Sequence, residues 1–282
     1  MRIQHNITAL NAHRNLSNNN SSVGKNLEKL SSGYKINRAG DDAAGLAISE
    51  KMRAQITGLE TAQKNANDGV SLVQTAEGAL TEVHSMLNRM VELATQSANG
   101  TYSSANRAEM QKEVDALNKE ITRIGNTSNF NGTKLFDGNT TSIVLHVGEE
   151  GTTNNQITVT LAAMNSTAVS KGDGSNSINL ETAAKVDSAS NAMAAISVIN
   201  SAIDNISSMR SDFGALQNRL EHTINNLGVQ TENITAAESR IRDVDMAKEM
   251  MAYTKNNILV QASQAMLAQA NQVPQGVLQL LQ

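Results

Sequence analysis

The sequence contains no cysteine and no tryptophan, and it has a single proline among 282 residues. A disulfide scaffold and a zinc–thiolate site both need cysteine, so the sequence excludes them. An average chain of this length carries about 14 prolines, and their scarcity leaves almost no fixed helix breaker. Aromatic residues make up 2% of the chain, whereas hydrophobic residues make up 39%. This combination is typical of a protein built from long helices.

Charge and hydropathy exclude two classes of partner. The net charge of −4 argues against a nucleic-acid partner, because proteins of that class neutralise phosphates with excess basic residues. No apolar run approaches the roughly 18 residues of a membrane span, so we expect no membrane insertion. The first residues, MRIQHN, carry no apolar stretch and no small-residue cleavage site, so they do not resemble a secretory signal peptide.

A heptad seam without charged residues predicts a helix over residues 42–98 that packs in a coiled-coil-like bundle. Its members are Leu59, Ala62, Ala66, Gly69, Val73, Ala76, Leu80, Val83, Leu87, Met90 and Ala94. An Asn-Gly pair and clustered serines at 97–105 predict a break. A second seam predicts a helix over 104–125, which the short break allows to fold back antiparallel.

A third seam predicts a helix over residues 180–238. Its members are Ala189, Met193, Ile196, Ile199, Ile203, Ile206, Phe213, Leu220, Ile224 and Leu227. Within 130–177 the period changes, because residues 142–147 and 156–161 are rich in β-branched side chains and flank a polar, glycine-containing connector. This pattern predicts a β-hairpin. The fold class is therefore mainly α, an elongated antiparallel helical bundle with a small β-hairpin insertion.

Both ends of the chain are helix-prone but poorly suited to burying a face alone. One short N-terminal stripe contains Ile3, Ile7 and Leu10, and a second contains Leu16, Val23, Leu27 and Leu30. Near the C-terminus, amide side chains share the apolar face with Met246, Val260 and Leu267. Short amphipathic helices are marginal in water, so these segments are candidates for folding on assembly.

No residue pattern favours catalysis, a cofactor or a metal. His5 and His13 could share a helical face, but no nearby acidic ligand completes a metal site. Asp41 and Asp42 could be a carboxylate pair, as could Asp243 with Asp245. Because Asp41 and Asp42 precede an alanine-rich helix, capping of its positive end explains them better. We therefore expect no enzyme.

Three segments closely resemble bacterial flagellin: residues 1–10 (MRIQHNITAL), 30–45 (LSSGYKINRAGDDAAG) and 258–275 (ILVQASQAMLAQANQVPQ). The resemblance covers roughly residues 1–140 and 180–282, in the family's order, and leaves no room for large variable outer domains. It implies an inner filament-core domain in which residues 1–40 and 243–282 pair as a two-helix coiled coil. Residues 41–242 would form the outer rod.

The resemblance also implies a structural role and a set of partners. The family is exported through the flagellar type III apparatus and polymerises into the extracellular flagellar filament, an open helical assembly. The implied partners are further copies of the chain, an export chaperone, the filament cap and the hook–filament junction proteins. We expect polymerisation contacts at Ile3, Ile7, Leu10, Leu27, Leu30, Ile258, Val260, Leu267, Leu278 and Leu281.

Residues 88–96 (NRMVELATQ) resemble the flagellin segment that Toll-like receptor 5 reads. The matching contact positions are Arg89, Leu93 and Glu113, while Asn88 and Val91 depart from the common family residues. An Arg fork and an apolar anchor one turn away suit an interface hot spot. Packing against neighbouring subunits explains the same residues, and the two roles are compatible.

A signalling coiled coil, such as the cytoplasmic part of a chemoreceptor, is the alternative from a different class. It shares the alanine-rich heptads and the low aromatic content. The β-hairpin island and the amide-rich ends favour the filament subunit, because a receptor hairpin carries its heptads through the tip and has a membrane span.

Overall fold

The computed structural model describes residues 6–138, 142–165, 168–169 and 177–280. The chain divides into two compact units. The terminal unit comprises Met1–Ile56 and Glu232–Gln282, and the central unit comprises Thr57–Thr231. Helices α2 (Ala43–Ala98) and α5 (Ala189–Arg242) contribute residues to both units. The boundaries therefore lie inside long helices, whereas the sequence suggested boundaries after residues 40 and 242.

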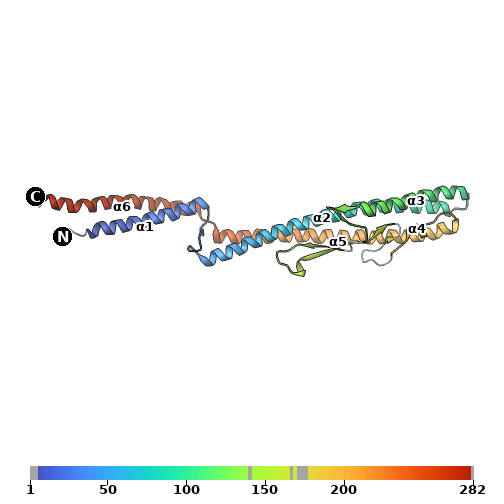
Figure 1. Ribbon diagram of the computed structural model, residues 1–282, viewed down its shortest axis with the longest axis horizontal. Coiled ribbons are helices and arrows are strands. Elements are labelled where there is room, and N and C mark those ends of the chain that lie inside the picture. Colours follow the sequence, from blue (N-terminus) through green and yellow to red (C-terminus); the bar gives the residue numbers. More distant parts are fainter. Residues whose placement is uncertain (1–5, 139–141, 166–167, 170–176, 281–282) are drawn as a thin grey trace. The chain divides into compact units, whose positions relative to one another are not determined.

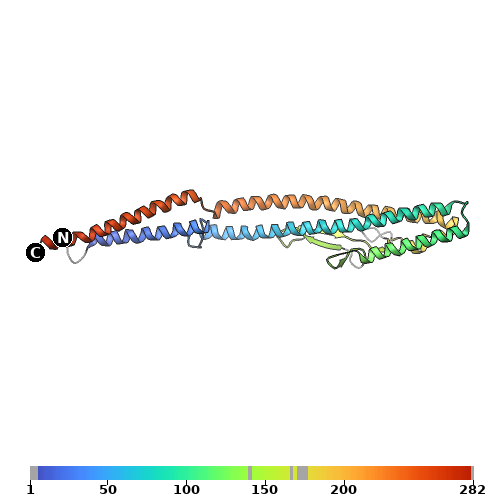
Figure 2. The same ribbon diagram turned by 90° about the horizontal axis from the view of Figure 1, so that it is seen from above.

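The central unit is an antiparallel bundle in which α2, α5 and α3 (Ser104–Thr127) share one hydrophobic core. Figure 2 shows α3 folded back along α2 after a short turn. Every member of the predicted α2 seam, from Leu59 to Ala94, is buried. Five of the seam residues are alanine or glycine, and small side chains let neighbouring helices approach closely. The mainly α antiparallel fold is confirmed.

The predicted helix over 180–238 is wrong in one respect, because it is broken near its start. Helix α4 (Leu180–Ala183) ends before a short connector, and α5 begins at Ala189. The connector is anchored at Val186, which is fully buried. Its carbonyl accepts from Ser97 Oγ (2.5 Å) and its amide donates to Gln111 Oε1 (2.6 Å). These two bonds satisfy the backbone amide and carbonyl of Val186, which lie outside any helix.

The expected position of Met193 in the third seam is also wrong. Met193 is 64% exposed, while Ala192 and Ala195 are fully buried. The buried series advances in steps of three and four from Ala192 through Ala195 to Ile199, and Met193 lies one residue off this register. Alanines occupy the contact positions there because the helices are close.

The predicted hairpin is confirmed as β3 (Ser142–His146) paired antiparallel with β4 (Gln156–Thr160), with a short 3₁₀ helix, Thr153–Asn155, just before β4. Two shorter hairpins were not predicted. One joins β1 (Asn129–Phe130) to β2 (Thr133–Lys134), and the other joins β5 (Met164–Asn165) to β6 (Ala168–Val169). Asn131 (φ 48°) and Gly132 (φ 81°) form the first of these turns. Two consecutive positive φ angles are what a type I′ hairpin turn requires.

In the terminal unit, α1 (Ile7–Ser32) lies antiparallel beside α6 (Met246–Leu280), as Figures 1 and 2 both show. The implied pairing of the two ends is confirmed. Helix α1 ends at Gly33, whose φ of 76° suits glycine, and whose amide donates to the Lys29 carbonyl. The segment that follows α1 then pairs through its backbone with the segment between α5 and α6. Lys35 N donates to Arg242 O (2.6 Å), and Val244 N donates to Gly33 O (3.0 Å).

Candidate interaction surfaces

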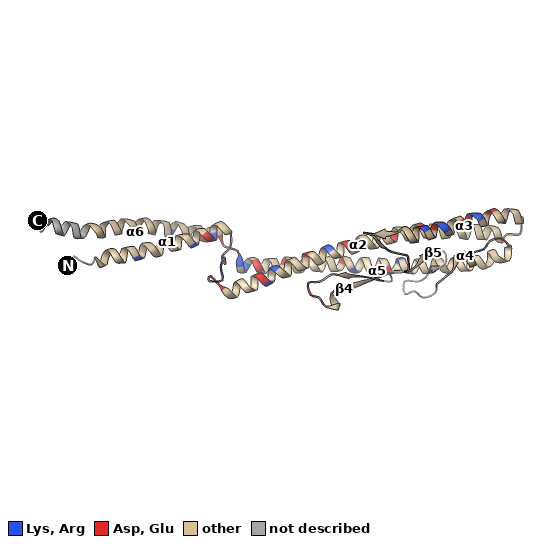
Figure 3. Cartoon of the chain, viewed as in Figure 1, with Lys and Arg blue, Asp and Glu red and all other residues tan. Residues whose placement is uncertain are grey.

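The α1·α6 pair exposes most of its large apolar side chains. No residue of α1 is buried, and none of residues 246–272 of α6 is buried. The exposed fraction is 61% at Ile7, 63% at Leu10 and 60% at Ile258. Charge is sparse as well, because residues 256–282 contain no Asp, Glu, Lys or Arg, and both helices are mostly tan in Figure 3. Large apolar side chains exposed in this number on one helix pair indicate an interaction site.

The residues suggested for polymerisation fall into three groups. Four are more than half exposed on this surface: Ile7, Leu10, Leu27 and Ile258. Three are half-buried along the line where the helices meet: Leu30, Val260 and Leu267. Ile3, Leu281 and the side chain of Leu278 lie outside the described residues. Five further large apolar side chains of α6 are exposed, of which the sequence analysis placed Met246 on the apolar face but expected none as a polymerisation contact: Met246, Met250, Met251, Leu259 and Met266.

A charged and aromatic cluster joins the start of α2 to the end of α5 within the terminal unit. The guanidinium carbons of Arg53 and Arg242 lie 5.9 and 4.8 Å from the centroid of the Tyr34 ring. Arg53 also pairs with Glu238 (2.9 Å), and Arg242 pairs with Glu50 (2.5 Å). Cations over a ring face are attracted by its quadrupole. The partners are 185 and 192 residues apart, so sequence spacing could not reveal this joint.

The carboxylates Asp41 and Asp42 organise the connector between α1 and α2. Asp42 Oδ1 accepts from the Gly45 amide (2.9 Å), which caps the first turn of α2 as the sequence suggested. Asp41 Oδ2 accepts from the amides of Arg38 (3.1 Å) and Asn37 (3.2 Å). These two hydrogen bonds lower the pKa of the Asp41 carboxyl. Both groups therefore have structural hydrogen-bond partners.

Asp245 has the corresponding role at α6. Its Oδ1 accepts from the Lys248 amide (3.1 Å) in the first turn of the helix. Asp243 lies two residues earlier, where its backbone pairs with Tyr34 in an isolated bridge. The second candidate carboxylate pair is thus divided between a helix cap and a backbone bridge.

The structure brings Arg89 and Glu113 together across α2 and α3. Arg89 Nε donates to Glu113 Oε1 (2.9 Å), and one terminal nitrogen donates to Glu92 Oε2 (2.9 Å). The bond to Glu113, followed by the bond to Glu92, raises the pKa of Arg89. Both partners of the Arg89–Glu113 pair are about half exposed, at 46% and 45%. They present an accessible, ordered ion pair.

The expected role of Leu93 as an accessible anchor at this interface is corrected. Leu93 is 2% exposed and belongs to the hydrophobic core of the central unit. Its neighbour Ala94 occupies the seam position, and the adjoining Leu93 side chain is covered along with it. Leu93 lies one turn after Arg89 on α2, and it offers almost no surface to a partner.

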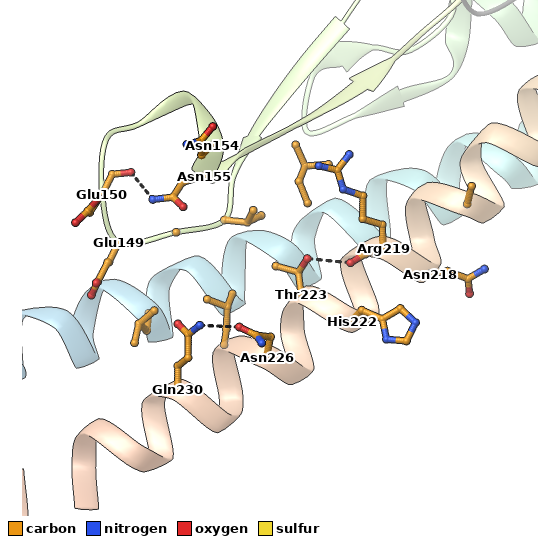
Figure 4. A pocket seen from close by; sticks show the side chains of 16 residues that line it. Glu149, Glu150, Asn154, Asn155, Asn218, Arg219, His222, Thr223, Asn226 and Gln230 are labelled. Carbon is orange, nitrogen blue, oxygen red and sulfur yellow. Dashed lines mark hydrogen bonds between the residues drawn. The ribbon is translucent and has the colours of Figure 1, made fainter. Parts of the chain in front are cut away.

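An open groove of about 880 Å³ lies in the central unit between the β3–β4 connector and α5. In Figure 4, Glu149 and Glu150 lie on the connector, whereas Arg219 and His222 project from α5. Amide side chains line much of the remaining wall, and Gln230 Nε2 donates to Asn226 Oδ1 (2.7 Å). The groove contains no cysteine or serine nucleophile among its lining residues.

The described residues contain neither a cluster of metal-ligating side chains nor a membrane-spanning helix. Among them, no group of three or more His, Asp or Glu side chains could hold a metal ion. His13 is exposed on α1, and His5 lies outside the described residues. No helix in the described part of the chain combines the length and the apolar character needed to cross a membrane.

Comparison with known proteins relates both ends of the chain to one family. Residues 3–141 match the bacterial flagellin N-terminal helical region, and residues 196–281 match the bacterial flagellin C-terminal helical region. The chain is 54% identical to a flagellin of Bacillus subtilis strain 168 over the full length of both. It is 48% identical to a flagellar filament 33 kDa core protein of Treponema phagedenis, again over both full lengths.

A solved structure from Vibrio parahaemolyticus, described as a flagellar hook-associated protein, has a similar fold. The match covers 72% of this chain and all of that chain, with a TM-score of 0.60 and 15% sequence identity. At that identity the likeness supports the fold alone.

Proposed function

The chain belongs to the bacterial flagellin family, and we propose that it polymerises with copies of itself into the extracellular filament of the bacterial flagellum. The observation that carries this proposal is the α1·α6 pair, which has no buried residue in its described part and exposes large apolar side chains. A monomer gains nothing from such a surface. A polymer buries it against neighbouring copies.

The magnitude of this burial favours a lattice with several neighbours per subunit. Nine large apolar side chains of α1 and α6 are between 40% and 68% exposed. Fully burying one such side chain contributes about 1.5–3 kcal/mol, so the exposed halves contribute about 1 kcal/mol each. Association costs about 4–15 kcal/mol of translational and rotational freedom. One neighbour that covers only part of the surface cannot offset this cost, whereas neighbours on several sides can.

Export and capping partners belong to the same proposal. We infer that the chain leaves the cell through the flagellar type III apparatus and is accompanied by an export chaperone. The filament cap and the hook–filament junction proteins contact it at the two ends of the filament. Family membership supports these roles, together with helices α1 and α6 that have little core of their own.

Polymerisation is tested by placing a polar group on the exposed surface. Purified Ile258→Asn should fail to form filaments of uniform diameter in ammonium sulfate, as judged by electron microscopy. Val144→Asn is the matched control, because Val144 is 54% exposed on β3 in the central unit. The control should polymerise like the unchanged chain. Normal filaments from a chain that carries both Ile258→Asn and Ile7→Asn would contradict the proposed role of this surface. Discrete short rods from the unchanged chain would favour a signalling coiled coil.

We propose a second role for the monomer as a ligand of Toll-like receptor 5, through Arg89 and Glu113. The supporting observation is their accessible ion pair, which holds the planar Arg89 guanidinium in one orientation. A pre-oriented Arg loses little side-chain entropy on binding. We further propose that Arg89 and Glu113 also pack against neighbouring subunits in the filament, so the receptor binds the monomer and not the filament.

The receptor role has its own matched pair of variants. Arg89→Ala should weaken receptor binding by the monomer, because it removes the oriented guanidinium. Arg123→Ala should not, although Arg123 is also an exposed arginine in an ion pair, with Glu120. Equal binding by Arg89→Ala and the unchanged monomer would remove the receptor claim and leave polymerisation untouched.

A further inference from the structure

Methionine carries all the sulfur in this chain, because the sequence has 12 methionines and no cysteine. In the core of the central unit the methionines are covered, since Met90 and Met164 are fully buried and Met209 is 2% exposed. On α6 the methionines are exposed instead: Met246, Met250, Met251 and Met266. The thioether groups are therefore divided between a protected core and the exposed surface of α6.

Met251 and Met266 are the two most exposed large hydrophobic side chains that the structure describes, at 68% and 67%. Ile258, which is 60% exposed, follows Met251 by seven residues and precedes Met266 by eight. Both intervals are close to two helical turns, so the three side chains line one face of α6. This face includes Ile258, which the proposed polymerisation requires a neighbouring copy to cover.

An exposed thioether reacts with peroxides. The sulfur lone pair attacks one peroxide oxygen, an S–O bond forms as the O–O bond breaks, and the proton of the attacked oxygen passes to the departing hydroxide, which leaves as water. The sulfur is oxidised to a sulfoxide and the peroxide is reduced. This change turns a flexible apolar side chain into a polar one, and methionine sulfoxide reductases reverse it, one enzyme for each epimer.

We propose that Met251 and Met266 are a redox-sensitive modification site that controls whether the chain can assemble. This inference rests on the proposed polymerisation. In the unassembled chain both thioethers are accessible to an oxidant, and a sulfoxide there stays hydrated. In the filament a neighbouring copy covers this face, so a sulfoxide is buried without a hydrogen-bond partner, which is unfavourable. Neither step requires α6 to be paired with α1 before assembly.

The site therefore acts in two directions. Oxidation of the unassembled chain blocks its addition to the filament, because the modified face is too polar to be buried. Addition of the reduced chain shields the same thioethers from further oxidant. Only subunits that keep both methionines reduced enter the filament, and those subunits then stay reduced.

The monomer is tested by treatment with dilute hydrogen peroxide before ammonium sulfate is added. Mass spectrometry of peptides scores each methionine, and electron microscopy scores filaments of uniform diameter. We expect sulfoxide at Met251 and Met266, and none at the buried Met90. The protein concentration needed for filaments should rise by about tenfold or more. Treatment with reductases for both epimers should restore assembly.

Leucine substitutions separate these two methionines from the others, because leucine keeps the volume and apolar character of methionine but has no sulfur. A chain with both Met251→Leu and Met266→Leu should polymerise like the unchanged chain, before and after peroxide. Met193→Leu is the matched control, because Met193 is 64% exposed but lies on α5 in the central unit. The control should remain sensitive to peroxide. In preformed filaments of the unchanged chain, Met251 and Met266 should oxidise more slowly than in the monomer.

The outcomes separate the redox site from polymerisation. If the oxidised chain assembles at the same concentration as the reduced chain, the redox site is refuted and polymerisation stands. Peroxide sensitivity in the double leucine variant, or equal oxidation rates in monomer and filament, would also overturn the assignment. If the reduced chain forms no filaments, polymerisation itself fails and control of assembly fails with it, whereas the mass spectra still decide whether Met251 and Met266 are the methionines that oxidise.

Discussion

Gly69 on α2 lies directly against the Leu145 side chain of the β3–β4 hairpin. A Cβ atom added at Gly69 would overlap Leu145 Cδ1, whose side chain extends from β3. One turn earlier on α2, Asn65 Nδ2 donates to the His146 carbonyl (3.0 Å) and ties the hairpin to the helix. The hairpin therefore has little freedom to move away. Gly69→Ala should force Leu145 out of its position.

Gly78 provides the comparison on the same helix. A Cβ atom at Gly78 meets nothing within 4 Å. Replacing a helix-interior Gly by Ala in open space stabilises by about 0.5–1 kcal/mol, so Gly78→Ala should raise the free energy of unfolding by that amount. Gly69→Ala gains the same backbone contribution, but overpacking costs about 1–3 kcal/mol. The two variants should therefore differ in free energy of unfolding by the overpacking cost alone.

Thermal unfolding followed by circular dichroism measures this difference. For a unit of this size, each kcal/mol shifts the midpoint by about 2–4 °C. Gly78→Ala should unfold above the unchanged chain, and Gly69→Ala should unfold below Gly78→Ala by about 2–12 °C. In a Leu145→Ala background the penalty at Gly69 should shrink, because the overlapping methyl group is gone. Equal midpoints for the two alanine variants would refute the close approach of the hairpin to α2.

Three further outcomes are expected. Gly45→Ala should destabilise the terminal unit despite its helix propensity, because the new Cβ would lie 2.5 Å from Asp42 Oδ2 and 2.8 Å from Ile36 Cδ1; a higher unfolding midpoint would contradict this packing. The pKa of Asp41, measured by carboxyl NMR, should lie below the pH at which an unperturbed aspartate titrates. Its stabilising contribution is thus present above that pH and is lost as the pH falls through the lowered value, and Asp41→Asn should remove this dependence. Amide hydrogens of residues 246–272 in the monomer should exchange faster than those of 59–94, and equal protection would contradict the low burial of α6.

The central unit could be predicted closely because its sequence contains all the information its packing needs. The seam from Leu59 to Ala94 has no charged member, so its period and phase are unambiguous. Met193 was misplaced because the prediction followed the larger side chain, while the contact positions belong to Ala192 and Ala195. The break before Ala189 was missed although Ser188 is a local signal, because its Oγ accepts from the Asn191 amide (3.2 Å) at the start of α5. The anchoring of Val186 could not be predicted, because its partners Ser97 and Gln111 are far away in the sequence.

In the terminal unit, the expected polymerisation residues remain a prediction. Ile7, Leu10 and Leu27 are exposed apolar side chains of α1, as a contact with neighbouring copies requires. The sequence did not indicate that Asn19 and Asn26 contact α6. Amides at a helix–helix contact are unfavourable on propensity and burial alone, so no pattern based on hydrophobicity selects them.

The disagreement between pattern and packing in the terminal unit has a physical meaning. In a sequence that folds to one structure, the local propensities, the apolar pattern and the core packing all favour the same structure. Conflicts between them concentrate where function imposes another demand. In the central unit, burial within the single chain satisfies the apolar pattern, with Leu80, Leu87 and Ile206 fully covered. In α1 and α6 the pattern is satisfied only if other surfaces cover Leu10 and Ile258. The exposed apolar side chains and the mixed apolar and amide line between α1 and α6 are therefore both consistent in the proposed filament, where a neighbouring copy covers the first and the other terminal helix of the same chain covers the second.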